Sequence, residues 1–329
     1  MSVFLNFLKK SFDRVLICDA EFRYADETKT VIEKVVCFVY KDLFTGDKFY
    51  FWEADKELSH PHFDYQKVLV IPFNAVAEGH AWLRLYHGKP NNCWDTYVEN
   101  IRLYKTMRSG PGALGLLSTA QAYGINETMT KEQKDEERDI VIKNKTYTDE
   151  LRERIQEYCL ADVELTEKVF RKQIADIEKK NKLLTDEDCY RELTQIMFRG
   201  ASQLNIAQVE RNGIPFDVPM VQEFNIYWPL VKDHLVKKYN ELINVFDENG
   251  TEKNELFEAM IKRNGLFANW KRTFNSGSLV KDLKYVKKFS NYPDIANYIK
   301  IKYFLNLNKL SSLQPGFDGK SRVSFNMFG

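Results

Sequence analysis

The most constraining feature of the sequence is an apolar run that ends in two acidic residues, Val15-Leu16-Ile17-Cys18-Asp19-Ala20-Glu21-Phe22. Its aliphatic and β-branched residues predict a strand that is buried on both faces. In an extended chain the side chains of Asp19 and Glu21 point to the same side. Two carboxylates beside a buried strand are costly unless cations compensate them, and hard carboxylate oxygens suit Mg²⁺ or Mn²⁺. Acidic residues also end ordinary solvated strands, so the pair becomes informative only together with other acids in the chain.

The elements predicted after this strand indicate an α/β domain with a mixed sheet. A helical pattern with apolar residues three and four positions apart extends from 149 to 180. Strands that come first and then alternate with helices are typical of such a fold. The strands are expected at 15–22, 32–40, 47–53 and 68–71, where β-branched and aromatic residues are separated by turn residues.

The length and the charge pattern predict two domains. A chain of 329 residues is long enough for two separate cores. The charged stretch 177–188 is the expected boundary, so a first domain is predicted over 1–180 and a mostly helical one over 181–329. Residues 126–157 are dense in charged side chains and at first lack an apolar stripe, which predicts a solvated loop and helix with a structural role at most.

Composition limits where the chain works and what it binds. The five scattered cysteines include no C-x-x-C pair, which argues against a disulfide framework and a zinc site. The apolar patch at 3–8 is too short for a signal segment or a membrane span, so we expect a cytoplasmic protein with no membrane partner. Residues 262–302 hold 10 basic and 2 acidic residues. That excess suits a phosphate backbone, although a solvated lysine-rich helix face would have the same composition.

Three more acidic positions could meet the opening pair. Asn74 and Glu78 follow the fourth predicted strand and open a helix, and Asp95 lies in the next loop. Tyr158 and Asp162 are spaced i, i+4, which places a phenol and a carboxylate on one helical face. Each position alone has a structural explanation as well: an acid that favours the helix dipole, an N-cap and a core tyrosine, respectively.

In this order the motifs resemble those of the DEDD superfamily of 3′→5′ exonucleases. The first motif of that family, D-x-E, is matched by Asp19 and Glu21. The third motif, Y-x-x-x-D, is matched by Tyr158 and Asp162, which identifies the tyrosine type of the family. The resemblance implies a ribonuclease H-like exonuclease domain.

The second motif departs from the family pattern. Asn74 matches the asparagine of N-x-x-x-D, but Glu78 stands where aspartate is usual. Asp95 therefore remains an alternative for the second-motif ligand.

The resemblance implies hydrolysis with two metal ions, Mg²⁺ or Mn²⁺. Asp19, Glu21 and Asp162 would hold one ion, and Asp19 would also bind the second, which Glu78 would reach through water. Tyr158 and Glu21 would orient the attacking water, and a nucleoside monophosphate would leave the 3′ end. Phe22 and Asn74 are the expected contacts to the nucleic acid in this domain.

The second half of the chain resembles the start of the polymerase domain of family A DNA polymerases, the bacterial or phage polymerase I type. Residues 192–217 resemble the helix that opens that domain, 274–283 resemble its FNxxSxxQL segment, and 318–329 resemble the stretch before its Thr-x-Thr-Gly-Arg motif. The part between would be thumb-like and would grip the backbone of primer-template DNA. The expected contacts from its basic segment are Lys271, Arg272, Lys284, Lys287 and Lys288.

The palm and the fingers of such polymerases would come later and are not in this sequence, so no polymerase activity is expected from this chain alone. Either the chain is a fragment or a separate chain supplies the rest. The sequence as a whole predicts the proofreading exonuclease of a family A polymerase. A 3′→5′ ribonuclease and a catalytically inactive DNA-binding scaffold for a partner polymerase chain are the alternatives.

Overall fold

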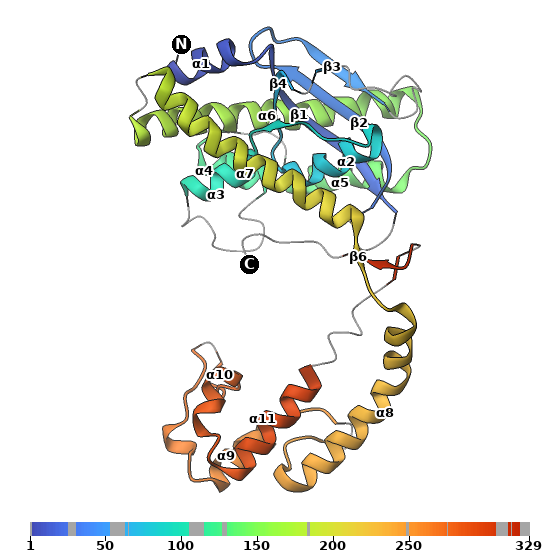
Figure 1. Cartoon of the computed structure of the whole chain (residues 1–329), viewed down its shortest axis with the longest axis vertical. Helices are drawn as coiled ribbons and strands as arrows, with labels where there is room; N and C mark the ends of the chain where they lie inside the picture. Colours follow the sequence, from blue (N-terminus) through green and yellow to red (C-terminus); the bar gives the residue numbers. More distant parts are fainter. Residues whose placement is uncertain are drawn as a thin grey trace. The chain divides into compact units, whose positions relative to one another are not determined.

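A computed structural model describes residues 2–25, 31–52, 63–64, 66–104, 115–126, 130–182, 185–247, 250–274, 276–306, 315–316 and 318–322. These residues form two compact units (Figure 1). The first unit comprises the described residues up to Gly213 together with Arg322, and the second comprises those from Ile214 to Ser321. The division therefore falls further along the chain than residue 180, where the charge pattern placed the boundary.

The first unit is built around a five-stranded mixed sheet, which confirms the α/β prediction. The strand order is β3-β2-β1-β4-β5. The central strand β1 pairs antiparallel with β2 and parallel with β4, β2 pairs antiparallel with β3, and β4 pairs parallel with β5. The strands are β1 (Arg14–Tyr24), β2 (Ile32–Asp42), β3 (Lys48–Phe51), β4 (Val68–Ile71) and β5 (Asn92–Cys93).

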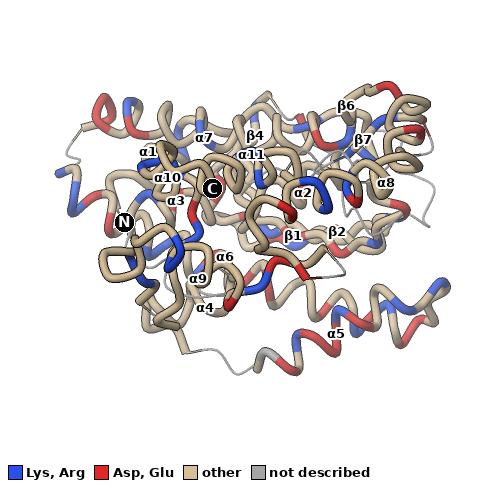
Figure 2. Tube along the Cα trace, turned by 90° about the horizontal axis from the view of Figure 1, so that it is seen from below, with Lys and Arg blue, Asp and Glu red and all other residues tan. Residues whose placement is uncertain are grey.

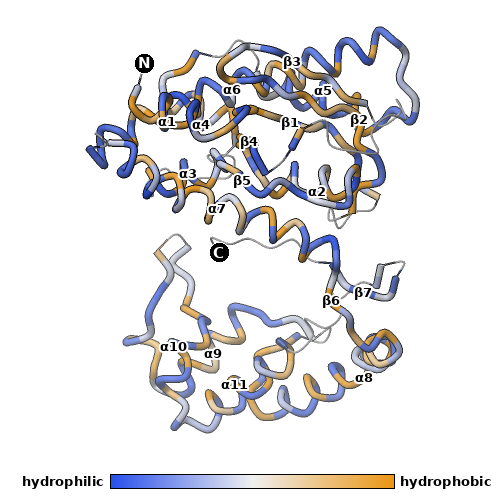
Figure 3. The backbone as a smooth tube through the Cα atoms, turned by 45° about the horizontal axis from the view of Figure 1, so that its top comes forward, coloured by the Kyte–Doolittle hydropathy of each residue, from blue (hydrophilic) through white to orange (hydrophobic). Residues whose placement is uncertain are grey.

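Helices cover both faces of the sheet, as the apolar run at its centre requires. Side chains of β1 alternate between two cores: Val15 and Ile17 pack with α6 and α1, whereas Leu16 and Cys18 pack with α2. Figure 3 shows the apolar character of the central strands. The helices of this unit are α1 (Val3–Ser11), α2 (Ala75–Tyr86), α3 (Thr96–Leu103), α4 (Leu116–Ala122), α5 (Lys131–Lys143), α6 (Asp149–Asn181) and α7 (Asp186–Asn212).

Helix α7 belongs to the first unit because two glycines let it approach the sheet and α2 closely. A Cβ on Gly200 would lie 2.1 Å from the carbonyl oxygen of Cys93 in β5. A Cβ on Gly79 of α2 would lie 2.8 Å from the Cβ of Ala207 in α7. A buried contact of 2.7 Å between His80 Nε2 and Glu210 Oε2 joins the same two helices. The chain leaves the unit only after α7, at Gly213, whose φ is 68°.

The second unit is mostly helical, as the sequence predicted. Its core is rich in aromatic rings, among them Phe257, Trp270 and Tyr298. No helix among the described residues is both long and apolar enough to cross a membrane. The elements of this unit are β6 (Ile214–Pro215), α8 (Val218–Ile243), α9 (Asn254–Arg263), η1 (Phe267–Asn269), α10 (Leu283–Val286), η2 (Lys287–Phe289), α11 (Pro293–Asn306) and β7 (Lys320–Ser321).

The close approach of α7 to β5 predicts that Gly200→Ala destabilises the protein although alanine is the better helix former. The new methyl group would overlap the Cys93 carbonyl group, and overpacking of this kind costs about 1–3 kcal/mol. Urea unfolding followed by circular dichroism measures the effect on the first unit. Ser202→Ala on the same helix is the control and should change the stability by less than about 0.5 kcal/mol. An unchanged or raised midpoint for Gly200→Ala would contradict the packing described here.

Candidate active site

A cleft of about 570 Å³ opens in the first unit beside the end of the parallel strand pair. It collects side chains from β1, α2, α5 and α6, elements that are far apart in the sequence. Seven residues singled out by their sequence motifs line it: Asp19, Glu21, Phe22, Asn74, Glu78, Tyr158 and Asp162. The basic residues of its lining are Arg23, Arg138, Lys143 and Lys145.

The sheet topology explains why the acids of β1 and α2 meet. Strand β4 pairs with β1 only as far as Ile71, which lies opposite Ile17, so Asp19 lies just beyond the end of β4. The chain leaves β4 and enters α2 directly, with Glu78 in the first helical turn. The carboxyl ends of parallel strands are the usual place for ligand sites in α/β folds. A register shift after Glu21 interrupts the ladder with β2 at the same edge.

The two acids of β1 share their surroundings with a cysteine of α6. Ligand atoms of Asp19, Glu21 and Cys159 all lie within 4.8 Å of one another. The thiol of Cys159 donates to Asp19, with Sγ 3.2 Å from Oδ2 and 3.4 Å from the main-chain oxygen. Burial raises the pKa of the Cys159 thiol, so this side chain acts as a hydrogen-bond donor that holds the carboxylate of Asp19 in place.

The remaining pair on α6 faces the same cleft. Asp162 is buried and forms an ion pair with Lys134 of α5. The ammonium group of Lys134 also lies 5.8 Å from the ring centre of Tyr158. Burial, followed by the charges of Glu21 and Asp162, raises the pKa of Tyr158, which keeps the phenol protonated and able to donate a hydrogen bond.

Glu78 is buried in the cleft wall, and only 4% of the residue is exposed. Among the residues that the structure describes, its Oε2 has no hydrogen-bond partner. Burial and the charge of Asp19 raise its pKa well above the ordinary value. An unpaired carboxylate oxygen in such a place is costly unless a cation or a donor completes it.

The carboxylates of β1 are destabilised in the same way. Burial, and next the charge of Asp162, raises the pKa of Asp19 to about 7. Burial, and next the charge of Asp19, raises the pKa of Glu21, while Arg138 opposes the change. The four carboxyl groups that converge on the cleft are thus short of positive charge, and their hard oxygen atoms fit divalent cations such as Mg²⁺ or Mn²⁺.

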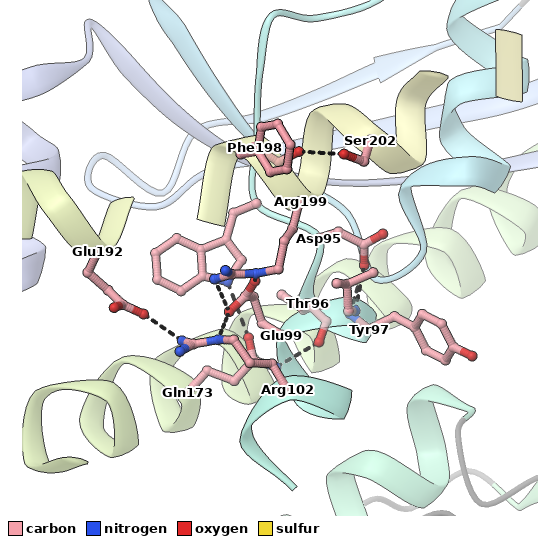
Figure 4. A network of polar contacts seen from close by, with 12 residues as sticks. Asp95, Thr96, Tyr97, Glu99, Arg102, Gln173, Glu192, Phe198, Arg199 and Ser202 are labelled. Atoms are coloured by element: carbon pink, nitrogen blue, oxygen red, sulfur yellow. Dashed lines mark hydrogen bonds and ion pairs between the residues drawn. The ribbon is translucent and has the colours of Figure 1, made fainter. Parts of the chain in front are cut away.

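Asp95, the alternative to Glu78, lies outside the cleft lining and caps helix α3 (Figure 4). Its Oδ1 accepts from the main-chain N–H groups of Tyr97 and Val98 at 2.9 and 3.1 Å. Its Oδ2 accepts from Ala75 at 3.0 Å, which connects this cap to the first residue of α2. All three bonds serve the main chain, so the carboxylate of Asp95 positions the helix that carries Glu78.

The same figure shows why α3 is held firmly against α7. The carboxylate of Glu99 contacts Arg102 at 2.6 Å and Arg199 at 2.5 Å (Figure 4). Arg102 also contacts Glu192 at 2.6 Å. Gln173 of α6 donates to the main-chain oxygen of Thr96 at 2.7 Å. This network therefore belongs to the scaffold around the cleft.

The sequence pattern gave residues 126–157 at most a structural role, but helix α5 lies in this stretch and places Arg138 and Lys143 in the cleft lining. Figure 2 shows basic and acidic residues alternating along this helix. In a sequence, such a pattern is typical of a helix that is exposed to solvent on every side. The i, i+4 spacing of Lys134 and Arg138 was the available signal, but nothing in the sequence showed that this face meets Asp162.

The five predicted basic contacts all lie in the second unit and are exposed. Lys271 and Arg272 precede a turn, and the phenol oxygen of Tyr285 accepts from the main-chain N–H of Lys271 at 2.8 Å. Trp270 stacks on Phe289 with ring centres 4.7 Å apart. These contacts bring the two segments together, so the basic residues share one region of the unit. The five basic residues are Lys271, Arg272, Lys284, Lys287 and Lys288.

Part of the polymerase resemblance depends on Asn275 and residues 323–329, and these lie outside the described residues.

Comparisons with known proteins support a polymerase-like fold. Neither a family model nor the sequence of a curated protein matches the chain. Among solved structures it is similar to the POL domain of Pol1 from M. smegmatis in complex with DNA primer-template and dNTP, with a TM-score of 0.62 and 12% identity. The match covers 98% of this chain and 51% of that chain, so this protein spans about half of its neighbour's length. The likeness shows the fold alone, and it gives no support to the expectation of a separate polymerase chain.

The raised pKa of Asp19 predicts how the stability of the metal-free protein depends on pH. The folded state holds a proton up to about pH 7 that the unfolded chain, with an ordinary value of 3.8, has already released. Stability should therefore fall as the pH rises from about 4 through 7 in the presence of a chelator. Asp19→Asn should remove much of that fall and raise the stability at pH 8 by about 1–3 kcal/mol.

Thermal unfolding at several pH values, with EDTA or with Mg²⁺, measures this effect. Mg²⁺ should stabilise the unchanged protein at pH 8 and should have little effect on Asp19→Asn. Asp233→Asn, an exposed change in the second unit, is the matched control. If the stability of Asp19→Asn depended on pH in the same way as that of Asp233→Asn, the assignment of the buried charge to Asp19 would be contradicted.

Proposed function

We propose that this chain is a two-metal-ion 3′→5′ DNA exonuclease and the proofreading part of a family A DNA polymerase. The observation that carries the proposal is the convergence of Asp19, Glu21, Glu78, Tyr158 and Asp162, from three separate elements, on one cleft. Their order along the chain is that of the DEDD motifs. The product would be a nucleoside monophosphate released from the 3′ end of DNA.

The fold supports this proposal in two ways. The strand order β3-β2-β1-β4-β5, with β2 antiparallel to β1 and with β1, β4 and β5 parallel, fits a ribonuclease H-like domain. The solved structure with a similar fold is a polymerase domain that holds DNA primer-template and dNTP. The second unit, with its exposed basic residues, would then be the thumb-like part that contacts the DNA backbone.

The residues of the cleft suit the two cations that such a reaction uses. Asp19, Glu21 and Asp162 would hold one cation, and Asp19 and Glu78 would hold the other. Bound Mg²⁺ or Mn²⁺ would activate a water molecule and stabilise the departing 3′ oxygen. The buried oxygen of Glu78, which has no partner within the described part of the chain, and the raised pKa values of Asp19 and Glu21 both favour a site that is completed by positive charge.

The other side chains have roles that follow from their own chemistry. The protonated phenol of Tyr158 can donate a hydrogen bond and so orient a water molecule beside Glu21. The ring of Phe22, half-buried at the cleft, offers a stacking surface for an unpaired base. Asn74 starts α2 without a side-chain capping bond, so its amide is available to the terminal nucleotide. Lys134 holds Asp162 in the cleft by its ion pair.

The test is a digestion assay on DNA labelled at the 5′ end, with single-stranded and mismatched primer ends. Mg²⁺-dependent shortening from the 3′ end is expected, and Asp19→Ala should lower the rate by at least about a thousandfold because a shared ligand is lost. Matched RNA strands should be cut more slowly, and faster cutting of RNA would favour a ribonuclease. DNA binding without any nucleotide release, with Mg²⁺ or Mn²⁺, would favour an inactive scaffold.

The second-motif ligand has a separate test. Glu78→Ala should lower the exonuclease rate by a factor of about 100 or more with little loss of stability, because its carboxylate faces the cleft. Asp95→Ala should lower the free energy of unfolding by about 1–3 kcal/mol, because three main-chain N–H groups lose their acceptor. Rate constants at saturating Mg²⁺ and urea midpoints should be measured for both variants. The opposite pattern would assign the ligand role to Asp95.

A further inference from the structure

We propose that Arg138 of α5 binds a phosphate of the substrate strand and so positions that strand in the cleft. The inference rests on the proposed nuclease function and deepens it by naming the residue that receives the strand. It also gives a role to a helix whose sequence pattern showed none. Three observations carry it: the place of Arg138, the pairing of its neighbours and the face of α5 on which it lies.

Arg138 is an exposed cation that lines the same cleft as the acids of β1. Its charge acts on Glu21 and Tyr158, and in both cases it opposes the rise in pKa that burial causes. Among the described residues Arg138 takes part in no ion pair and no hydrogen bond. Its guanidinium group is thus available to a ligand that enters the cleft.

Neighbouring charges on α5 are already engaged. Lys134 pairs with Asp162, Lys143 contacts Asp139 at 2.5 Å, and Glu137 contacts Arg154 at 2.7 Å. None of the acids of α5 is part of the cleft lining. The acidic side chains of α5 therefore lie outside the cleft lining, whereas Arg138 lies in it.

The position of Arg138 on the helix predicts the path of the strand. Lys134, Arg138 and Ile142 are spaced i, i+4, i+8 and so lie on one face. Lys134 anchors the start of this face at Asp162, while Ile142, which also lines the cleft, is 50% exposed. A strand whose 3′ end lies at the carboxylates would pass Arg138 and place an apolar part of a nucleotide against Ile142.

Arginine is the residue type that this position needs. The four carboxylates of Asp19, Glu21, Glu78 and Asp162 repel a phosphodiester, so a strand gains from a cation in the lining of the same cleft. The planar guanidinium group can donate two parallel hydrogen bonds to one phosphate, which fixes orientation as well as distance. Lysine would keep the charge but lose that geometry.

The experiment measures binding separately from cleavage. A fluorescent single-stranded tetranucleotide is titrated with the intact chain in EDTA, where no metal-dependent cleavage occurs, at several KCl concentrations. Arg138→Gln should weaken binding roughly tenfold, as the loss of a charged hydrogen bond predicts. The slope of log affinity against log salt should become shallower by about 0.7, the value for one phosphate contact on a single strand. Arg138→Lys should keep the slope but recover only part of the affinity.

Two controls separate this role from others. Arg191→Gln, an exposed change on α7 outside the cleft lining, should leave affinity and slope unchanged. Lys237→Gln, an exposed change on α8 in the second unit, should do the same. Unchanged affinity and slope in Arg138→Gln would overturn the proposal, and so would a loss of binding that accompanies a lower melting temperature.

The outcome does not depend on whether the chain cleaves DNA. If no nucleotide is released with any divalent cation, the proposed function fails, but the salt slope still reports whether Arg138 contacts phosphate. If nucleotides are released, Arg138→Gln should raise KM for the tetranucleotide about tenfold and change kcat much less, because the lost contact is present before and during the reaction. An equal loss in kcat with no change in KM would overturn the positioning role.

Discussion

The mutual repulsion of buried carboxyl groups at the end of β1 determines which other charges the site needs. Four carboxyl groups converge on a cleft where burial raises the pKa of Asp19, Glu21 and Glu78. Such an arrangement is unfavourable unless positive charge arrives from elsewhere. Lys134 and Arg138 of α5 supply part of that charge, and the carboxylate oxygens also suit divalent cations. Carboxyl groups with perturbed pKa values gather at functional sites, which favours a functional role for this cluster.

The scaffold holds these charges in place through burial on both faces of one strand. The apolar side chains of β1 pack against α6 on one face and α2 on the other, and these two helices carry the remaining acids. Any shift of either helix would separate the carboxylates, and α7 restrains α2 by close packing at Gly79. Asp95 adds to this restraint, because its bond to Ala75 ties the start of α2 to the cap of α3. The residue that competed with Glu78 in the sequence thus contributes to the position of Glu78 in the fold.

Much of the fold and part of the site could be predicted because the relevant signals are local. The alternation of apolar residues in β1 and the i, i+4 spacing of Tyr158 and Asp162 each depend on a few neighbouring positions. Helix α5 has no such signal, since its contact with the cleft uses polar side chains on a helix that otherwise faces solvent. The partnership of Cys159 with Asp19 was hidden for another reason: a thiol in a helix beside a strand looks like an ordinary core residue.

The sequence by itself determined the elements, the apolar centre of the sheet and the identity of the acids that could act together. It could not choose between Glu78 and Asp95, because both precede or open a helix and both become buried. The tertiary structure separates them by direction: three main-chain donors occupy Asp95, whereas Glu78 faces the cleft. It also decided that α7 joins the first unit and that α5 faces the acids. Those choices depend on contacts between residues tens of positions apart, and periodicity along one segment carries no information about them.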